Sequence, residues 1–491
     1  MLPRMRHLDL PQQVHNQPNQ EPMVVDEAEA TSEEVVSVLN PTFELEMYAA
    51  QYTGLAKLNR LLFIADRCPP MRIEALRLAL DHVMGTLNVN KYQEVFRKLC
   101  DALQAANAQG VPDVADTYEL PQVDAHWVDS RLKQVALKTE KLDNDLKNYK
   151  ANSIKESIRR GTDDLGEHYL DCGDLNNALR SFARARDYCT SGRHVIDYCL
   201  NVTRVSVYLQ YWQHVESYVT KAENTPEVII ATSATTQAGP STDSVSPTII
   251  DKLRCCRGIA ALATKKYKKA ALHFLQANAY NCDFPDIMAA RDVAMYAGLC
   301  ALASFDRAEL ARNIINQQNF KQFLELDPQL RDIIQYFYES RYGQCLALLD
   351  SIQDNLLLDI YLAPHVSALY GQIRKRAWIQ YFSPYSSADM NRMASAFNTT
   401  VQQVEEEIMQ LILDNQIQAR IDSQNKIVYA RDVDQRTTTF QKCVEIGDEL
   451  ERRTKALMLR ATLIKHRIVV KCPPRMMATC IVNGERENKN L

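Results

Sequence analysis

Apolar side chains recur every three or four positions along most of the chain, and this spacing predicts a mostly α-helical protein. The pattern begins near Tyr48, and Ile73, Leu76 and Leu80 form one early face. Such a face allows a helix to bury one side against its neighbours. A proline-containing break at 111–122 separates the first helices from a long charged one. We therefore expect packed helices joined by short breaks.

A repeat signature follows in this helical region. It consists of Leu165, Gly166, Tyr169, Gly173, Ala178, Phe182 and Ala185, which is the spacing of a tetratricopeptide repeat. Gly166 and Ala178 would let two antiparallel helices approach, Phe182 would fill the groove, and Gly173 would lie in the turn. Weaker copies are Gly258, Ala270, Phe274 and Ala277, then Gly298, Ala301, Phe305 and Ala308. The pattern predicts a TPR-like antiparallel helical-repeat array rather than regular tandem repeats.

Residues 381–431 have a different pattern. Ser386 is expected to open a helix whose buried face contains Met390, Met393, Ala394 and Phe397. Thr400 would cap the next helix, with Gln403 completing a capping box. The buried side of that second helix is predicted to be Val401, Val404, Ile408, Leu411 and Ile412.

Two short strands are predicted after these helices. Ile417, Ala419 and Ile421 alternate as in a strand, 422–425 forms a turn, and 427–429 returns. Helix, helix and hairpin together make a winged helix, a module that either reads nucleic acid or serves in assembly.

The segment 437–470 predicts one long helix. Leu450, Leu457 and Ile464 are seven residues apart, and Thr454, Ala461 and Ile468 follow them by four. Small residues in this series favour close helix packing. Pro473 ends the pattern.

The composition is that of an ordinary globular chain, with a formal net charge of −4 over 491 residues. Nine acidic residues and no Lys or Arg occur between Asp9 and Ala56, which predicts a disordered acidic tail. Nine of the seventeen residues in 232–248 are Ser or Thr, as in a flexible insertion. The thirteen Cys form no C-x-x-C pair, so reduced thiols in the cytoplasm or nucleus are expected. The sequence contains no run of about 18 apolar residues, so we predict no membrane span.

The sequence offers no recognisable catalytic constellation. The ten His include no H-x-H or H-E-x-x-H arrangement for zinc, and His365 is expected to be a capping or surface residue. Cys255 and Cys256 are adjacent, so one is expected to pack and the other to be partly exposed. We therefore predict no catalytic, metal-binding or cofactor-binding residues.

Nucleic-acid binding is disfavoured by the charges of the winged helix. Its second helix carries Glu405, Glu406, Glu407 and Asp414 and no basic residue, so it would repel phosphate. The segment 451–475 has eight Lys or Arg against one acid, which leaves contact with RNA or an acidic protein surface open.

A helical-repeat array that leads into a winged helix resembles the PCI domain of the proteasome lid, the COP-nine signalosome and an initiation factor. Longer strings resemble the subunit-one family of the signalosome: 282–285 (CDFP), 293–296 (VAMY), 355–365 (NLLLDIYLAPH), 381–385 (YFSPY), 388–390 (ADM), 397–400 (FNTT) and 429–436 (YARDVDQR). The related PCI subunit of the proteasome lid is the nearest competitor, and an RNA-associated PCI protein of translation or mRNA export is the other alternative.

The resemblance implies a non-catalytic scaffold in a complex that removes a ubiquitin-like modifier from cullins by means of a zinc site on another subunit. Its expected partners are other PCI subunits, the metalloprotease-type subunits and, through the complex, cullin-RING ligases, in the cytoplasm and nucleus. Winged helices of such subunits pair edge to edge, which here implicates Ile417, Ala419, Ile421, Ile427 and Tyr429. Their C-terminal helices form a bundle, which implicates Leu450, Leu457, Ala461, Ile464 and Ile468.

The corresponding domains are a tail (1–45), an N-terminal repeat domain (46–223), the insertion (224–248), a PCI domain (249–432, with its winged helix at 381–432), a bundle helix (433–470) and a flexible tail (471–491).

Overall fold

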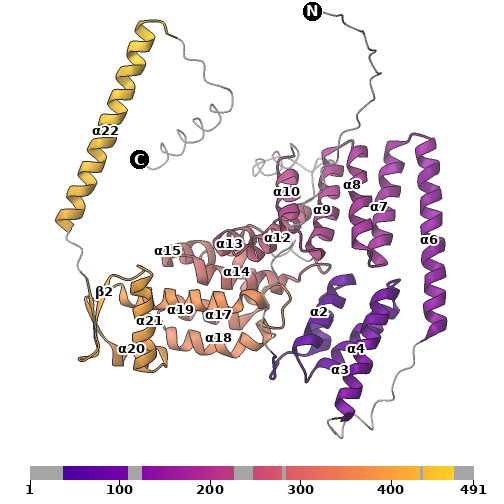
Figure 1. The fold of residues 1–491 in the computed structure, drawn as a ribbon, viewed down its shortest axis with the longest axis horizontal. Coiled ribbons are helices and arrows are strands. Elements are labelled where there is room, and N and C mark those ends of the chain that lie inside the picture. The colour runs from indigo at the N-terminus through magenta and orange to yellow at the C-terminus, as the bar shows by residue number, and fades with distance from the viewer. Residues whose placement is uncertain (1–36, 109–123, 226–246, 279–283, 432–434, 469–491) are drawn as a thin grey trace, which may run out of the picture. The chain divides into compact units, whose positions relative to one another are not determined.

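A computed structural model describes residues 37–108, 124–225, 247–278, 284–431 and 435–468. The chain divides into two compact units, Met1–Trp378 and Ile379–Leu491 (Figure 1). Both are built mainly from helices, as the apolar spacing predicted, and the fold class is confirmed.

The first unit begins with helices α1 (Leu45–Ala49), α2 (Gly54–Arg67), α3 (Arg72–Met84) and α4 (Val89–Ala108). Val38 and Leu45 are buried against them, and the Val38 amide donates to the Arg67 carbonyl at 3.0 Å. The segment from Val38 to Leu45 is therefore folded, whereas 1–45 was predicted to be disordered. Residues 1–36 of that predicted tail lie outside the described part.

The repeat array continues through α6 (Ala125–Ala151), α7 (Lys155–Asp171), α8 (Leu175–Ala185), a 3₁₀ turn η1 (Arg186–Tyr188), α9 (Gly192–Tyr208) and α10 (Trp212–Glu223) (Figure 1). The first predicted repeat is confirmed by the pairing of α7 with α8. A Cβ on Gly166 would stand 2.7 Å from the Phe182 ring, and Gly173 has a φ of +80° in the turn. Glycine is required at both positions because one is sterically blocked and the other is left-handed.

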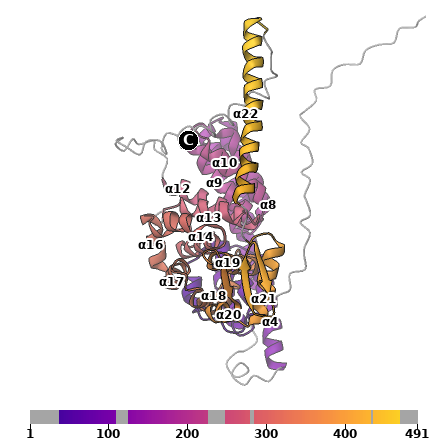
Figure 2. The same ribbon diagram turned by 90° about the vertical axis from the view of Figure 1, so that its left-hand side faces the viewer.

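The chain then continues with helices α12 (Pro247–Ala263), α13 (Tyr267–Leu275), α14 (Ala290–Ser304) and α15 (Arg307–Leu310), and with a π-turn η3 (Ala311–Ile315) (Figure 2). After these come α16 (Gln318–Leu326), α17 (Pro328–Tyr338), α18 (Tyr342–Leu356), a 3₁₀ turn η4 (Ala363–His365) and α19 (Val366–Phe382). Gly258 on α12 packs against Phe274 on α13, which confirms the second repeat.

The third predicted repeat is wrong. Gly298 and Ala301 both lie within α14, so they cannot face each other across a turn. Gly298 instead approaches Leu330 of α17, at 2.9 Å for an added Cβ. The same small-residue spacing here serves contact with a later helix.

The second unit contains β1 (Ser387–Asp389), α20 (Met390–Phe397), α21 (Val401–Leu413), β2 (Ala419–Asp422), β3 (Ile427–Ala430) and α22 (Gln435–Lys465) (Figure 2). The strands form one antiparallel sheet in the order β1-β3-β2, with Val428 of β3 opposite Ala388 and Ile421. Val428 is fully buried. The sheet and the two short helices form the predicted winged helix.

Most of the predicted insertion and the predicted tail from 471 onward lie outside the described residues. None of the helices in the described ranges combines the length and hydropathy of a membrane span. The remaining domain boundaries stay predictions.

Candidate partner interfaces

The two helices of the winged helix are fixed by local capping. The Thr400 hydroxyl and the Gln403 side chain form the predicted capping box of α21, whose buried residues are Val404, Ile408 and Leu411. Asn398 ends α20 in a left-handed conformation with a φ of 53°. Ser386 does not open α20, because the next three residues pair with β3 as a strand and the Asp389 side chain caps the helix.

The exposed side of α21 is acidic. Glu405 accepts hydrogen bonds from Ser423 and from Lys426, the latter at 3.2 Å. These bonds lower the pKa of Glu405, Ser423 contributing more than Lys426, and hold α21 against the β2–β3 turn. Met409 and Leu413, one turn apart, expose their side chains. The helix that would enter a DNA groove thus presents carboxylates and two apolar groups, a surface suited to protein rather than phosphate.

The free edges of the sheet differ from the prediction. The wing has three strands, and β3 pairs on both sides, so Ile427 and Tyr429 are on the central strand and not at an edge. Ile417 precedes β2 and is buried. Ala419 and Ile421 do lie on an edge strand, β2, and the other edge is β1. The short β1 was missed because Ser387–Asp389 carries no apolar alternation. Whether these residues contact a partner stays a prediction.

The long C-terminal helix exposes apolar side chains. Leu450, Leu457 and Ile464 are 65%, 66% and 68% exposed, and Ala461 is exposed as well. Ile468, which was predicted on the same helix, lies beyond its end, because Arg467 takes a left-handed φ of 53°.

These residues belong to a wider apolar stripe on α22. At about 100° per residue, its members fall within roughly 160° of the helix circumference. The stripe consists of Phe440, Cys443, Val444, Ile446, Gly447, Leu450, Thr454, Leu457, Met458, Ala461 and Ile464. A two-stranded coiled coil buries a narrower seam, so a stripe of this width suits a helix with neighbours on more than one side.

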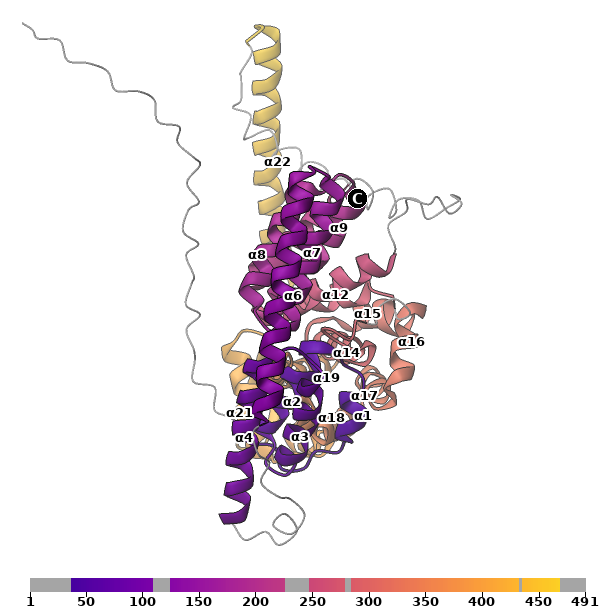
Figure 3. The ribbon, with the colours of Figure 1, turned by 90° about the vertical axis from the view of Figure 1, so that its right-hand side faces the viewer.

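A buried cation lies within the first unit, although no sequence pattern pointed to it. Arg60 on α2 is 1% exposed, and its guanidinium donates to Asp359 at 2.7 Å and to Asp292 at 3.1 Å. Asp292 lies on α14 and Asp359 follows α18. Figure 3 labels these two helices and α2. These partners are 299 and 232 residues away in sequence, so Arg60 ties the N-terminal helices to the later part of the array.

Three tyrosines complete this network. Arg60 donates to the Tyr48 hydroxyl at 2.8 Å, Tyr52 donates to Asp292 at 2.6 Å, and Tyr296 donates to Asp359 at 2.7 Å. Burial alone would lower the pKa of Arg60, but its anionic and phenolic neighbours raise that pKa above its usual value. The cation therefore stays charged, and its bonds are internal to the unit.

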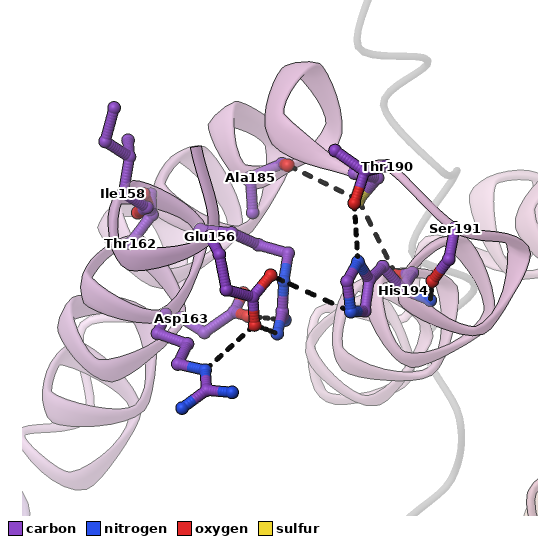
Figure 4. A network of polar contacts seen from close by, with 11 residues as sticks. Glu156, Ile158, Thr162, Asp163, Ala185, Thr190, Ser191 and His194 are labelled. Atoms are coloured by element: carbon purple, nitrogen blue, oxygen red, sulfur yellow. Dashed lines mark hydrogen bonds and ion pairs between the residues drawn. The ribbon is translucent and has the colours of Figure 1, made fainter. Parts of the chain in front are cut away.

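A second, more exposed polar network joins α7 to α9 (Figure 4). Glu156 accepts from Arg159 and Arg160, each at 2.9 Å, and lies 3.8 Å from His194 at the start of α9. The bond from Arg159 is the main reason that the pKa of Glu156 falls to about 2. Its arginines also satisfy its oxygens, so this carboxylate serves as a structural link between repeats.

The thiols and the imidazole singled out in the sequence lie deeper in the protein than predicted. Cys255 and Cys256 are both buried, contrary to the expectation that one is partly exposed. Burial raises the pKa of Cys256 to about 12, so its thiol is protonated. His365 is also buried, not at the surface, and burial lowers its pKa to about 4. No group of three His, Cys, Asp or Glu side chains in the described residues could hold a metal ion.

Comparison with known proteins gives the family. Three family models match: 26S proteasome subunit RPN7 at residues 124–313, the PCI domain at 317–432, and the C-terminal helix of COP9 signalosome complex subunit 1 at 435–462. COP9 signalosome complex subunit 1b of Drosophila melanogaster is 50% identical over 92% of each chain. The chain belongs to the COP9 signalosome subunit 1 family. Subunit 1 of Arabidopsis thaliana is 43% identical over 90% of this chain and 95% of its own.

Membership of the subunit 1 family decides against the alternative assignment to the related PCI subunit of the proteasome lid. The 26S proteasome non-ATPase regulatory subunit 6 of Caenorhabditis elegans is only 22% identical over 80% of this chain. The PCI match begins at 317, whereas the sequence pattern placed that domain from 249, so 249–313 falls within the RPN7 match. The C-terminal match coincides with most of α22 and its stripe.

Proposed function

We propose that this chain is a non-catalytic scaffold subunit of the signalosome. The observation that carries the proposal is the apolar stripe of α22, which is exposed in the described chain and coincides with the part that matches the subunit 1 C-terminal helix. Leu450, Leu457 and Ile464 are already about one-third covered, so burying the remainder is worth roughly 3–6 kcal/mol before the cost of association. A helix with this much uncovered apolar surface favours packing against other helices.

Within the complex, the chain would support removal of a ubiquitin-like modifier from cullins and so regulate cullin-RING ubiquitin ligases. Bond cleavage belongs, in this proposal, to a metalloprotease-type subunit. The first unit, with its interior charges paired internally, provides a rigid arm, and β2 with Ala419 and Ile421 provides an edge for a neighbouring winged helix. The complex would act in the cytoplasm and the nucleus.

The matched variants Leu457→Asp and Leu459→Asp test the scaffold role. Leu457 lies in the stripe, whereas Leu459 lies on the opposite face of α22, and both are more than half exposed. Each full-length variant is mixed with the other signalosome subunits, and assembly is measured by size-exclusion chromatography with mass detection. Leu457→Asp should lower the yield of complex at least ten-fold and Leu459→Asp should not. Equal assembly of the two variants contradicts the bundle role.

RNA association is the alternative from a different class, and the basic segment after Glu451 is what favours it. A titration of the full chain with a short RNA at about 50 and 200 mM salt distinguishes the two, because phosphate contacts give a steep salt dependence. The acidic side of α21 supports the scaffold.

A further inference from the structure

Four exposed lysines lie in the turn between α12 and α13 and in the first turn of α13. They are Lys265, Lys266, Lys268 and Lys269. A cation at the N-terminus of a helix opposes the helix dipole, so this placement works against the stability of α13. Lys265 also takes a left-handed φ of 59°, in the kind of turn where the first repeat has Gly173. The local fold therefore does not explain why lysines are found here.

Two further turns of the array are joined to these lysines by contacts. Lys268 on α13 pairs with Glu309 on α15 at 2.9 Å. Arg307 on α15 donates to the carbonyl of Tyr338, just before the turn between α17 and α18, at 2.8 Å. The segments 264–269, 304–309 and 338–342 thus form one surface, which we call the basic edge.

The acidic side chains of the basic edge are already paired within the chain. The pairs are Asp306 with Arg376, Glu309 with Lys268, and Glu339 with Arg341, at 3.0, 2.9 and 3.3 Å. In contrast, Lys265, Lys266 and Lys269 are exposed and form no ion pair with a carboxylate in the described ranges. These three unpaired lysines give the basic edge positive charge that is available to a carboxylate-rich segment.

The aromatic side chains of the basic edge are not placed to bind a nucleic-acid base. Tyr267 is buried among the lysines, and its ring lies edge-on to His365. The guanidinium of Arg307 lies 5.1 Å from the centre of the Tyr338 ring and covers it. Sites for single-stranded nucleic acid combine positive charge with aromatic rings on which bases stack. The basic edge therefore suits carboxylates better than RNA.

The chain itself contains a segment of the opposite charge. Residues 21–34, which lie outside the described residues, include six acidic side chains and no Lys or Arg. Four of the six, at 26, 27, 33 and 34, form two adjacent pairs. This acidic segment has the charge that the unpaired lysines need.

The point where this segment joins the described chain is close enough to the basic edge. Two hydrogen bonds, of 3.1 and 2.6 Å, hold Thr42 to Asn355 at the C-terminal end of α18. Arg341 of the basic edge lies at the other end of α18, about 21 Å away at 1.5 Å per residue. Asp26 is 16 residues before Thr42, and an extended chain of that length spans up to about 53 Å. The acidic segment can therefore reach the basic edge and continue along it.

We propose that the acidic segment 21–34 docks on the basic edge of its own chain, with the carboxylates of 26–29 facing the three unpaired lysines. This inference does not depend on the scaffold function. Each exposed ion pair is weak, but the short connection to Thr42 keeps the segment at a high effective concentration near the lysines. Docking occupies the basic edge in the free chain, so another acidic partner binds there only by displacing the segment.

The first test is zero-length cross-linking of the full-length chain with a carbodiimide, which joins a carboxylate to a neighbouring lysine amine. Mass spectrometry should find links from 26–29 to the three unpaired lysines. These links should be at least five times as abundant as links to Lys133 and Lys141, two exposed lysines of α6. They should decrease strongly between about 0.1 M and 1 M salt, because the Debye length falls from about 10 Å to about 3 Å.

The second test compares two matched pairs of substitutions in the full-length chain. Lys265→Glu with Lys269→Glu reverses the charge of the basic edge, and Lys133→Glu with Lys141→Glu makes the same change on α6. A glutamate at the N-terminus of α13 favours the helix, so the first variant should remain folded. A glutamate-specific protease should cleave the segment 26–34 about three-fold faster in the first variant, because the segment is released from weak ion pairs. The rate in the α6 variant should equal that of the parent.

Links that go mainly to Lys133 and Lys141, or no links from 26–29 at all, overturn the inference. Equal cleavage rates in the two variants overturn it as well. Links that join two chains would assign the basic edge to the acidic segment of a second copy. Binding of a short RNA that Lys265→Glu with Lys269→Glu removes, without links from 26–29, would assign the edge to nucleic acid. Either of these results also contradicts docking within one chain.

Discussion

The network around Arg60 and the helix α22 differ in which side chains they bury: the network buries charged groups, whereas α22 exposes apolar ones. In the first unit a fully buried cation is surrounded by two carboxylates and three phenols, so the unit satisfies its own charges. In α22 Leu450, Leu457 and Ile464 are about two-thirds exposed, and the side chains of Arg453 and Lys455 are exposed as well. The charges of the first region are paired within the same unit, whereas the hydrophobic surface of the second is uncovered.

This difference indicates where stability and assembly are encoded. Buried ion networks are costly to desolvate, and removing one member leaves uncompensated charge. An uncovered apolar helix adds little to the stability of the free chain, because helical stability in proteins comes mainly from tertiary packing. Mutations in the network should therefore affect folding, and mutations in the stripe should affect association.

The largest effect is expected from Arg60→Met. The substitution leaves Asp292 and Asp359 buried without their cation, which should lower the free energy of unfolding of the first unit by about 3–5 kcal/mol. Urea unfolding of the full chain followed by circular dichroism measures this, with Arg97→Met on the exposed side of α4 as the control. Equal midpoints for the two variants would show that the network is not structural.

A smaller loss is expected from Gly258→Ala. A Cβ at this position would stand 2.5 Å from the Phe274 ring, and such overpacking should cost about 2–3 kcal/mol. Gly371→Ala on α19 is the matched control, because no atom lies within 4 Å of its added Cβ. That control should be neutral or stabilising in the same unfolding assay, and a loss as large as that of Gly258→Ala would refute the steric explanation.

A comparable but pH-dependent effect is expected at His365. Burial lowers the pKa of His365 to about 4 from a usual 6.5, so the folded state favours the neutral ring. Its contribution to stability is complete above pH 6.5 and is lost as the pH falls toward 4, by an amount of the order of 2 kcal/mol. His365→Gln should flatten this part of the curve of unfolding free energy against pH. Parallel curves for variant and parent would contradict the prediction.

The smallest effect is expected in α22 itself. No atom lies within 4 Å of a Cβ added to Gly447. Gly447→Ala should therefore stabilise the helix by about 0.5–1 kcal/mol and increase the helicity of the free chain. Circular dichroism at increasing temperature measures the change. If helicity falls, Gly447 must already be in close contact with another element.

Much of this fold could be predicted from local patterns in the sequence. The pairing of Gly166 with Phe182 and the capping box of Thr400 with Gln403 follow from short-range spacing, and both are confirmed. The extent of α22 was predicted to within a few residues, except that the left-handed Arg467 ends it before Ile468.

Features that depend on distant residues were not predictable in the same way. Gly298 has the spacing of a repeat but contacts Leu330, because helix α14 continues through Ala301. Arg60 looks like one more polar position on an amphipathic helix, and only folding brings Asp359 to it across 299 residues. The strand β1 becomes a strand only because β3 pairs with it.

Amide hydrogen exchange across α22 tests the central claim most directly, by comparison of the isolated full-length chain with the same chain in the reconstituted signalosome. The account predicts rapid exchange from Gln435 to Lys465 in the isolated chain and strong protection in the complex, with little change around Arg60. Strong protection of α22 already in the isolated chain, or none in the complex, would contradict it.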